Sequence, residues 1–431
     1  MSKIRIFCGG GLAAVAIATA TPAGATVGYF SNGYDTESKS MAGIGVSMGE
    51  GPVAAANNPA LGLKLGNQAG GCMSFFMPHR DITISGGASP GADLKTGTFN
   101  SSKELFEVPC LGANYMVNDQ TAVGALLYAN GGMNTYYKSN PLVGNGTVFG
   151  GAISPSNPYG SDIEQVFMSV NVARDVTHGV TLGLAPIFAA QRVNMQGLQA
   201  FDNPAGGATS TLAKGFVTNN GYDYSYGGGA KIGVTYDPVQ WLTLGVSYQT
   251  RIWMGKFDKY KGLFAEQGGF DVPPSLTEGL TVRPFKGLEL STEHEQIYYS
   301  QIRSIHNDGR AGAGLLGSDG GAGFGWQNMH IYRFGTQWKA LDDLTLRAGY
   351  SYNTIFTKTT QMFFNTLAPA TPQHHLAFGG SYDITPAWSV SLGYVHAFSN
   401  ALQGAQQNDA AQTIKLRMDQ DEATIGLKFK W

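Results

Sequence analysis

The C-terminal end of the chain alternates strictly between apolar residues and small or polar ones. Its odd-numbered positions carry Ala423, Ile425, Leu427, Phe429 and Trp431. Its even-numbered positions carry Thr424, Gly426, Lys428 and Lys430. Because successive side chains of a β-strand point to opposite faces, this pattern gives one apolar face and one polar face. The same alternation recurs at 242–248, 344–350 and 388–394, which predicts a protein built largely from such strands.

The composition excludes the other large classes of protein. Only 13% of the 431 residues are charged and 60 are glycine, whereas a soluble protein has about 25% charged residues and about 7% glycine. Beyond the N-terminal leader, no stretch approaches the roughly 18 apolar residues of a membrane-spanning helix. The 23 Phe, 20 Tyr and 6 Trp are too many for a disordered chain. A membrane β-barrel fits, because its strands are apolar on the lipid side only.

Residues 1–25 have the features of a secretory signal peptide. Lys3 and Arg5 precede an apolar stretch, and Ala23–Ala25 is a small-residue cleavage site. We therefore expect a mature chain that begins at Thr26. Removing the leader leaves 26 basic and 30 acidic side chains, and this balance does not suggest a nucleic-acid partner.

Fourteen segments fit the pattern of a spanning strand: 68–78, 105–117, 120–131, 161–175, 178–191, 224–237, 240–253, 275–284, 286–298, 329–340, 343–354, 373–385, 387–399 and 421–431. Connections of one or two residues alternate with loops of about 18 to 32 residues. Short periplasmic turns and long extracellular loops are typical of Gram-negative outer-membrane barrels. We predict an all-β fold, a 14-stranded antiparallel transmembrane β-barrel over 68–431, whose closure leaves no strand edge facing lipid.

The segment 26–67 precedes the first predicted strand and lacks clean alternation. It carries too many apolar residues for a free tail, among them Met41, Ile44 and Leu61. Fourteen strands enclose a wide lumen, since about eight already fill their own interior. We expect this segment to be an N-terminal plug, or hatch, inside the barrel; a periplasmic arm is the alternative.

Four motifs resemble the FadL/TodX family of outer-membrane transporters for long-chain fatty acids and hydrocarbons. They are Asn57–Leu61 after a Gly/Ala-rich run, Phe257–Phe264 in a long loop, Val272–Thr277 at a strand entry, and Arg347–Tyr350 ahead of a loop that contains proline. The resemblance extends from the plug to Trp431. It implies a monomeric fourteen-stranded barrel with a hatch, an external hydrophobic groove, and sideways exit of substrate at a kink in the third strand.

The third strand runs into Gly131 and Gly132, and glycines mark bends in strands. These two residues are our candidates for the kink, with Asn58, Pro59 and Ala60 of the hatch beneath it. The alternative is that the two glycines merely begin a loop. One departure from the family pattern is Glu278, which the alternation places on the lipid side, so that it must lie near a polar rim or in an irregular strand.

Passive uptake of hydrophobic compounds, such as long-chain fatty acids or aromatic hydrocarbons, is the predicted function, without cofactor, nucleotide or metal. A general porin-like channel and an outer-membrane lipid-modifying enzyme are the alternatives. The eight histidines are scattered along the sequence, which disfavours a nucleophile paired with a histidine base. His374 and His375 point to opposite faces of a strand, which disfavours a metal site.

Two sets of residues are candidates for binding the substrate. Phe257, Tyr260, Leu263 and Phe264 would form one apolar stripe on a helical loop, either as an external capture groove or as packing between loops. Arg251 and Arg333 could hold a fatty carboxylate, because guanidinium pairs with carboxylate through two hydrogen bonds. The alternative is that the arginines and glutamates of the lumen form salt bridges between wall and plug.

Cys72 and Cys110 fall nearly opposite each other on the first two strands, so they could form a disulfide, or remain free thiols. Trp431 ends the last strand and resembles the C-terminal signal read by the barrel-assembly machinery. We expect the outer surface of the barrel to contact outer-membrane lipid and lipopolysaccharide.

Overall fold

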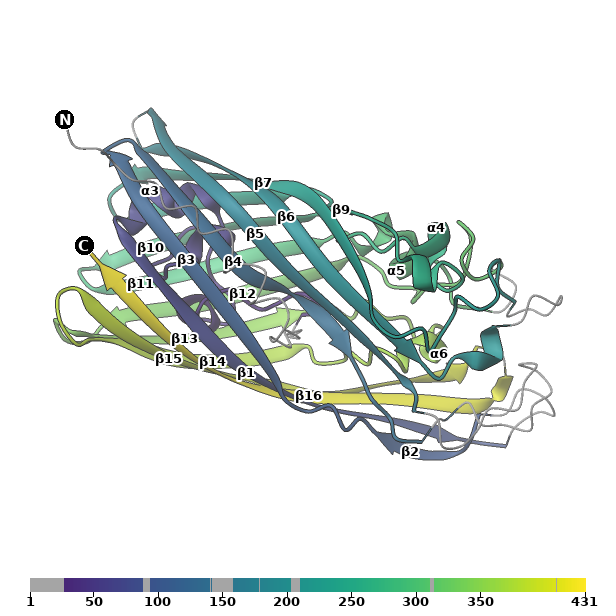
Figure 1. Cartoon of the computed structure of the whole chain (residues 1–431). Coiled ribbons are helices and arrows are strands. Elements are labelled where there is room, and N and C mark those ends of the chain that lie inside the picture. The colour runs from purple at the N-terminus through teal and green to yellow at the C-terminus, as the bar shows by residue number, and fades with distance from the viewer. Residues whose placement is uncertain are drawn as a thin grey trace.

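The computed structural model describes residues 27–87, 94–139, 141, 158–177, 179–202, 210–310, 314–407 and 409–431, and the predicted leader lies outside them. Within these residues, fourteen long antiparallel strands form a closed barrel (Figure 1). Their bounds are β1 Gln68–Ser85, β3 Phe106–Asn118, β4 Thr121–Asn134, β5 Gly160–Thr177, β6 Val180–Gln196, β7 Asp223–Val239, β8 Leu242–Gln249, β10 Ser275–Phe285, β11 Leu288–Ile297, β12 Met329–Lys339, β13 Leu344–Asn353, β14 His374–Asp383, β15 Trp388–Gln406 and β16 Asp409–Lys430. This confirms the predicted fold class.

Closure comes from β16, which pairs with β1 from Gln68 opposite Lys430 to Ser85 opposite Thr413. The described residues include two shorter strands, β2 (Gly97–Asn100) beside β1 and β9 (Trp253–Met254) beside β7. Trp431 follows β16 and stacks on Phe429 with ring centroids 5.8 Å apart. Its role in assembly remains a prediction.

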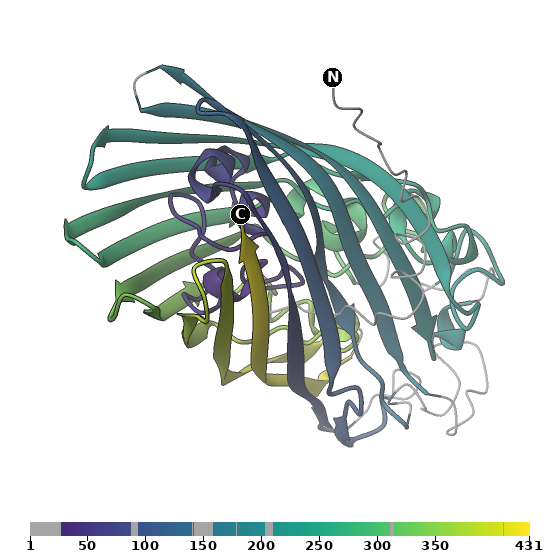
Figure 2. The ribbon, with the colours of Figure 1, turned by 60° about the vertical axis from the view of Figure 1, so that its left-hand side comes forward.

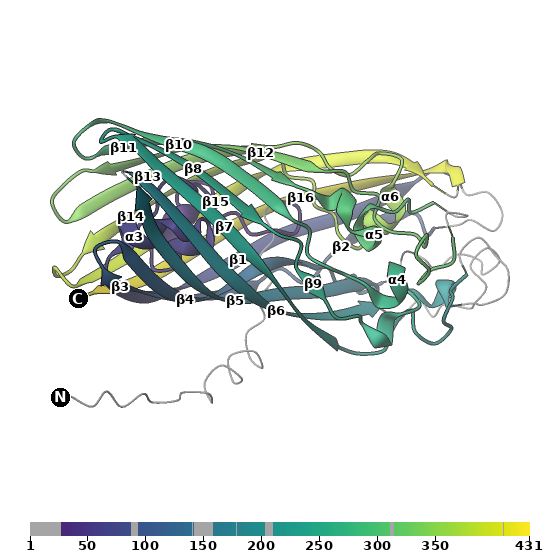
Figure 3. The same cartoon turned by 90° about the horizontal axis from the view of Figure 1, so that it is seen from above.

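Tight turns gather at the end of the barrel that holds the C-terminus, and the long connections gather at the other end (Figure 3). The long connections carry the short helices η3 Gln199–Phe201, η4 Asp258–Tyr260, α4 Ala265–Gly268, η5 Tyr299–Gln301, α5 Arg303–His306 and α6 Met362–Asn365. In the described part of the chain, no helix has the length and apolar character needed to cross a bilayer.

The segment from Val27 to the start of β1 lies inside the ring of strands, near the C-terminal end of the chain (Figure 2). It contains α2 Thr36–Lys39, η1 Ala54–Ala56, η2 Pro59–Leu61 and α3 Gly62–Leu65. Glycines of the wall let it approach closely: a Cβ at Gly183 would collide with the backbone of Pro59 and Ala60. We call residues 27–67 the hatch.

The last hairpin corrects the prediction of a long loop between 399 and 421. β15 continues to Gln406, and β16 begins at Asp409. In this upper part the apolar side chains face inward, as Ile414, Leu416 and Met418 do, and the charged ones face outward. β1 changes in the same way: Ile82 and Ile84 are buried, although the strand was predicted to end at residue 78.

The inversion marks where the strands leave the apolar layer of the membrane. Met77 pairs with Asp421, and below this level the outward positions of β1 and β16 are apolar or glycine. Glu278 also lies on the outward face, in an unbroken part of the β10–β11 ladder, and its carboxylate lies 3.3 Å from Nδ1 of His294. Polar side chains therefore mark the outer edge of the apolar band on β1, β16, β10 and β11, and we call this edge the polar rim.

Candidate functional site: a gap between two strands

The barrel wall opens between β3 and β4. These strands pair from Asn118 opposite Thr121 up to Leu111 opposite Leu127, and there the ladder stops. The next residues of β3, Phe106–Cys110, keep β1 as their partner, while β4 continues beside β5. Pro109, which has no N–H, suits a strand with a free edge. The gap lies at the level of Phe75 on the outward face of β1, and β3 carries the exposed Glu107 opposite Phe75.

β4 turns inward at this point because it contains an extra residue. Ala129 is opposite Val166 of β5 and Gly131 is opposite Gln165, so Asn130 is a bulge. Gly131 has φ of 151°, which a residue with a side chain rarely adopts. From Tyr128 to Asn134, β4 is buried on both faces. The structure thus places the bulge next to the predicted glycines.

The first hatch residues occupy the edge that β4 presents inward. The Ser31 N–H donates to the Asn130 carbonyl at 2.7 Å, and the Gly132 N–H donates to the Tyr29 carbonyl at 3.0 Å. Phe30 forms a β-bridge with Gly131. Asn58, Pro59 and Ala60 lie elsewhere, against β5, β6 and β7, where Asn58 donates to the Val46 carbonyl at 2.7 Å. The expectation that they lie beneath the kink was wrong.

A mainly apolar pocket that opens to the outside lies behind the gap. Its lining comes from β1, β3, β4, β16, the hatch and the loop before β14: Phe76, Phe106, Met133 and Met418, with Gly28, Gly132, Asn134, Arg80 and Ala368–Ala370. Above the pocket the wall is restored, because Ser101 bridges to Tyr137 and Tyr137 to Tyr159. The gap is therefore a window with an upper and a lower edge.

Aromatic rings connect the long loops to this window. Ring centroids are separated by 6.0 Å for Phe257–Phe264, 5.2 Å for Phe264–Phe270, 6.3 Å for Phe270–Tyr29 and 5.1 Å for Tyr29–Phe30. All five side chains are buried. They form a continuous apolar column from the loop after β9 to the hatch residue that pairs with Gly131.

The structure brings together the loop residues that the sequence analysis selected. Phe257, Tyr260, Leu263 and Phe264 are all buried, and the Tyr260 hydroxyl donates to the Gly221 carbonyl at 2.6 Å. Neighbouring loops cover the stripe. Apolar side chains that remain exposed lie beside it: Leu212, Phe216 and Leu315. The backbone joins them, since the Leu212 N–H donates to Leu316 and the Gly262 N–H to Phe216.

Both arginines selected for a substrate carboxylate have acidic partners in the protein. Arg251 contacts Asp271 at 2.6 Å. Arg333 is buried, contacts Glu295 at 2.7 Å, and donates to Asn32 of the hatch at 3.2 Å. A fatty carboxylate would have to displace these partners.

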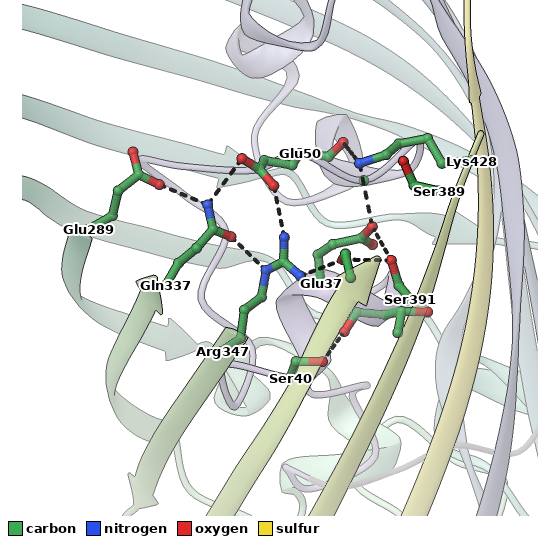
Figure 4. Close-up of polar contacts among 12 residues, drawn as sticks. Glu37, Ser40, Glu50, Glu289, Gln337, Arg347, Ser389, Ser391 and Lys428 are labelled. Atoms are coloured by element: carbon green, nitrogen blue, oxygen red, sulfur yellow. Dashed lines mark hydrogen bonds and ion pairs between the residues drawn. The ribbon is translucent and has the colours of Figure 1, made fainter. Parts of the chain in front are cut away.

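The lower lumen contains a polar network between hatch and wall (Figure 4). The buried guanidinium of Arg347 on β13 donates to Glu50 of the hatch at 2.8 Å and to Gln337 on β12 at 2.6 Å. Gln337 donates in turn to Glu289 on β11 at 3.0 Å. Glu37 accepts from Ser391 of β15 at 3.0 Å. These contacts fasten the hatch to β11–β16.

The two cysteines are directly opposite each other on β1 and β3. Their Cα atoms are 4.9 Å apart, and the structure joins their sulfur atoms. Cys110 precedes Leu111, the last residue of β3 that pairs with β4. The cysteine pair therefore lies at the lower edge of the window.

Sequence reasoning missed several residues of the window. Phe76 and Phe106 lie at predicted strand ends, and Tyr29, Phe30 and Arg80 lie outside any predicted strand. A search for inward apolar alternation would have extended the first strand through Ile82 and Ile84, and so past Arg80. The pairing of the first hatch residues with β4 has no local signal that we can name.

A closed barrel with an apolar outer band, a filled lumen and a window in its wall defines a plugged outer-membrane transport barrel. The chain belongs to the outer membrane protein transport protein family (OMPP1/FadL/TodX), whose model matches residues 14–430. This confirms the resemblance and the outer-membrane location. The family is one of transport proteins, so the chain is not an enzyme.

The chain is similar to Outer membrane protein P1 of Haemophilus influenzae, with 24% identity over 308 residues, 65% of this chain and 63% of that protein. The match thus spans less than two thirds of the relative. Among solved structures, the Pseudomonas putida toluene transporter TodX has a TM-score of 0.69 at 19% identity, covering 93% of this chain and 99% of that one. A Pseudomonas aeruginosa FadL homologue has a TM-score of 0.66 at 15% identity, covering 94% and 99%. These similarities show a shared fold.

Proposed function

We propose that this protein imports hydrophobic small molecules passively, and releases them sideways into the membrane through the window between β3 and β4. The window supports this proposal most strongly, because an unpaired strand edge below the polar rim, with an apolar pocket behind it, gives a route that avoids the polar lower lumen. The similarity to proteins named TodX and FadL also supports hydrophobic substrates, such as aromatic hydrocarbons or long-chain fatty acids.

Uptake would begin at the loops. Leu212, Phe216 and Leu315 form an exposed apolar surface beside the buried aromatic column, and exposed apolar patches commonly mark binding sites. A molecule captured there would move along the column as the aromatic side chains of the column change position. It would then reach the hatch residues Tyr29 and Phe30. Their backbone bonds to β4 close the inner side of the window.

Capture can be separated from loop folding by comparing two sets of variants. Leu212→Ser with Leu315→Ser should weaken binding of a labelled hydrocarbon and leave folding unchanged, since both side chains are exposed. Phe264→Ser should instead loosen the loops, because its ring is buried. Equal affinity in the Leu212/Leu315 variant would contradict capture at this surface.

Deleting Asn130 tests sideways release. Without the extra residue, β4 would run in regular register with β5, and its continuation could pair with β3. Asn130→Ala keeps the bulge and is the matched control. Initial uptake of labelled toluene and oleate should fall to background in the deletion variant and stay near wild type in the control. Unimpaired uptake by a correctly folded deletion variant would rule out the window as the exit.

A further inference from the structure

Arg80 is a buried cation at the upper edge of the window. Its residue is 7% exposed, and it lies on β1 with its guanidinium 5.7 Å from the centre of the Phe106 ring. One terminal nitrogen donates to the carbonyl of Asn134 at the end of β4, and the other donates to the carbonyl of Lys103 before β3. Arg80 thus joins the two sides of the wall where the window ends.

In the part of the chain that the structure describes, Arg80 forms no ion pair, and Glu104 is an acid that acts on its charge from a longer distance. Its contacts are backbone carbonyls, which are neutral, and its Nε is buried with no hydrogen-bond partner. Lys103, its neighbour over the same ring, pairs with Asp162 at 2.5 Å. Buried charges in proteins are normally paired, because moving a charged group out of water without a partner costs free energy. The unpaired guanidinium therefore favours an anion that arrives from outside.

The pocket beside Arg80 fits an amphiphile. Phe76, Phe106, Met133 and Met418 supply an apolar body, and Arg80 supplies a single cationic end. Arg80 is three residues beyond Met77, which marks the outer limit of the apolar band, so it lies about 10 Å along the strand above that level. The part of the window beside Phe106–Cys110 lies below the same level. A molecule with its anionic head at Arg80 would extend its tail downward, toward the opening.

We infer that Arg80 binds the carboxylate of a long-chain acid at the exit, and so selects acids over uncharged hydrocarbons of the same length. This inference rests on the proposed sideways release. The bound orientation, head at the polar rim and tail in the apolar band, is the one that the acid adopts in the outer leaflet. Release then requires no reversal of the molecule.

Uptake of radiolabelled laurate and dodecane by cells that express each variant tests the inference. Arg80→Gln should lower the initial rate for laurate roughly ten- to hundredfold, as expected for losing a hydrogen bond to a charged group, and change the dodecane rate less than twofold. Arg417→Gln is the matched control, since Arg417 is exposed on β16 and pairs with Asp81 at 2.6 Å. It should behave as wild type with both compounds.

A laurate rate within twofold of wild type in folded Arg80→Gln protein would overturn the inference, and so would equal losses for both compounds. If that variant does not fold, Met418→Glu decides, because it leaves the carbonyl contacts of Arg80 in place and supplies an acid to the pocket. Compared with Met418→Gln, it should lower laurate uptake at least tenfold relative to dodecane; an equal ratio would overturn the inference. If wild type transports neither compound above background, the proposed function fails instead.

Discussion

The hatch contacts the two sides of the barrel in different ways. Toward β11–β16 it is held by ion pairs: Lys39 pairs with Glu422, and both are buried, while the buried Arg347 pairs with Glu50, which is exposed. Toward β4 it is held by two backbone hydrogen bonds, in which Ser31 donates to Asn130 and Tyr29 accepts from Gly132. Removing one partner of a buried ion pair costs about 3–5 kcal/mol, whereas one backbone hydrogen bond contributes about 0.5–1.5 kcal/mol. The difference indicates an anchored side and a side that can open while the plug stays in place.

Glu422→Gln should give the largest effect, because it leaves the ammonium of Lys39 buried without an acid. We expect a loss of about 3–5 kcal/mol in the attachment of the hatch, seen as lower thermal stability and higher ion conductance in planar bilayers. The double variant Lys39→Met with Glu422→Leu removes both charges and should recover much of the loss. If the single variant has the ion conductance and thermal stability of wild type, the Lys39–Glu422 pair does not anchor the hatch.

The cysteine pair tests the lower edge of the window. If the bond forms in the exported protein, alkylation without reductant should add no alkyl group in intact-mass measurement, and alkylation after reduction should add two. Replacing both cysteines by serine should then reduce stability by about 2–4 kcal/mol. Two alkyl groups on the unreduced mature protein would exclude the bond.

Gly131→Ala tests the side that opens. The φ of 151° at this position is strained for any residue with a Cβ, so we expect a cost of about 1–3 kcal/mol and slower uptake. Gly228→Ala on β7 is the control, since the nearest atom to its added Cβ is a carbonyl oxygen at 3.3 Å. Equal uptake by the two variants would show that the bend in β4 is dispensable.

Asp308 should give the smallest effect, although it also belongs to an ion pair. Hydrogen bonds from Arg310 lower the pKa of this loop carboxyl to about 2. Since its folded pKa is below its unfolded value near about 4, its contribution is present above that value and is lost as the pH falls toward 2. Arg310 is exposed and Asp308 is partly exposed, so Asp308→Asn should change stability by less than about 1 kcal/mol at pH 7. A larger loss of stability would show that burial does not explain the difference between the Lys39–Glu422 pair and the Asp308–Arg310 pair.

The strands could be predicted because lipid on one side and water or hatch on the other impose a period of two. The same rule failed above the rim, where water lies outside and packed loops lie inside, so that β16 carries Ile414 and Leu416 inward. The window could be predicted only as far as Gly131 and Gly132. Its opening depends on which backbone edges pair, and the pairing of Ser31 with Asn130 joins segments 99 positions apart. Arg80 was missed for a related reason, since its strand was predicted to end two residues before it.

The inverted pattern on β16 also fixes how deep the protein sits in the bilayer. Asp421, Asp419, Arg417 and Lys415 follow one another on the outward face, directly above Ile425 and Ala423. If the barrel moved deeper into the bilayer, these charges would enter hydrocarbon, where a lysine or arginine costs about 2–4 kcal/mol at the midplane. If it moved outward, apolar side chains would enter water. A membrane of different thickness must therefore stretch or thin around the barrel. The depth at which a transported molecule enters the outer leaflet is thus set by the protein and not by the surrounding lipid.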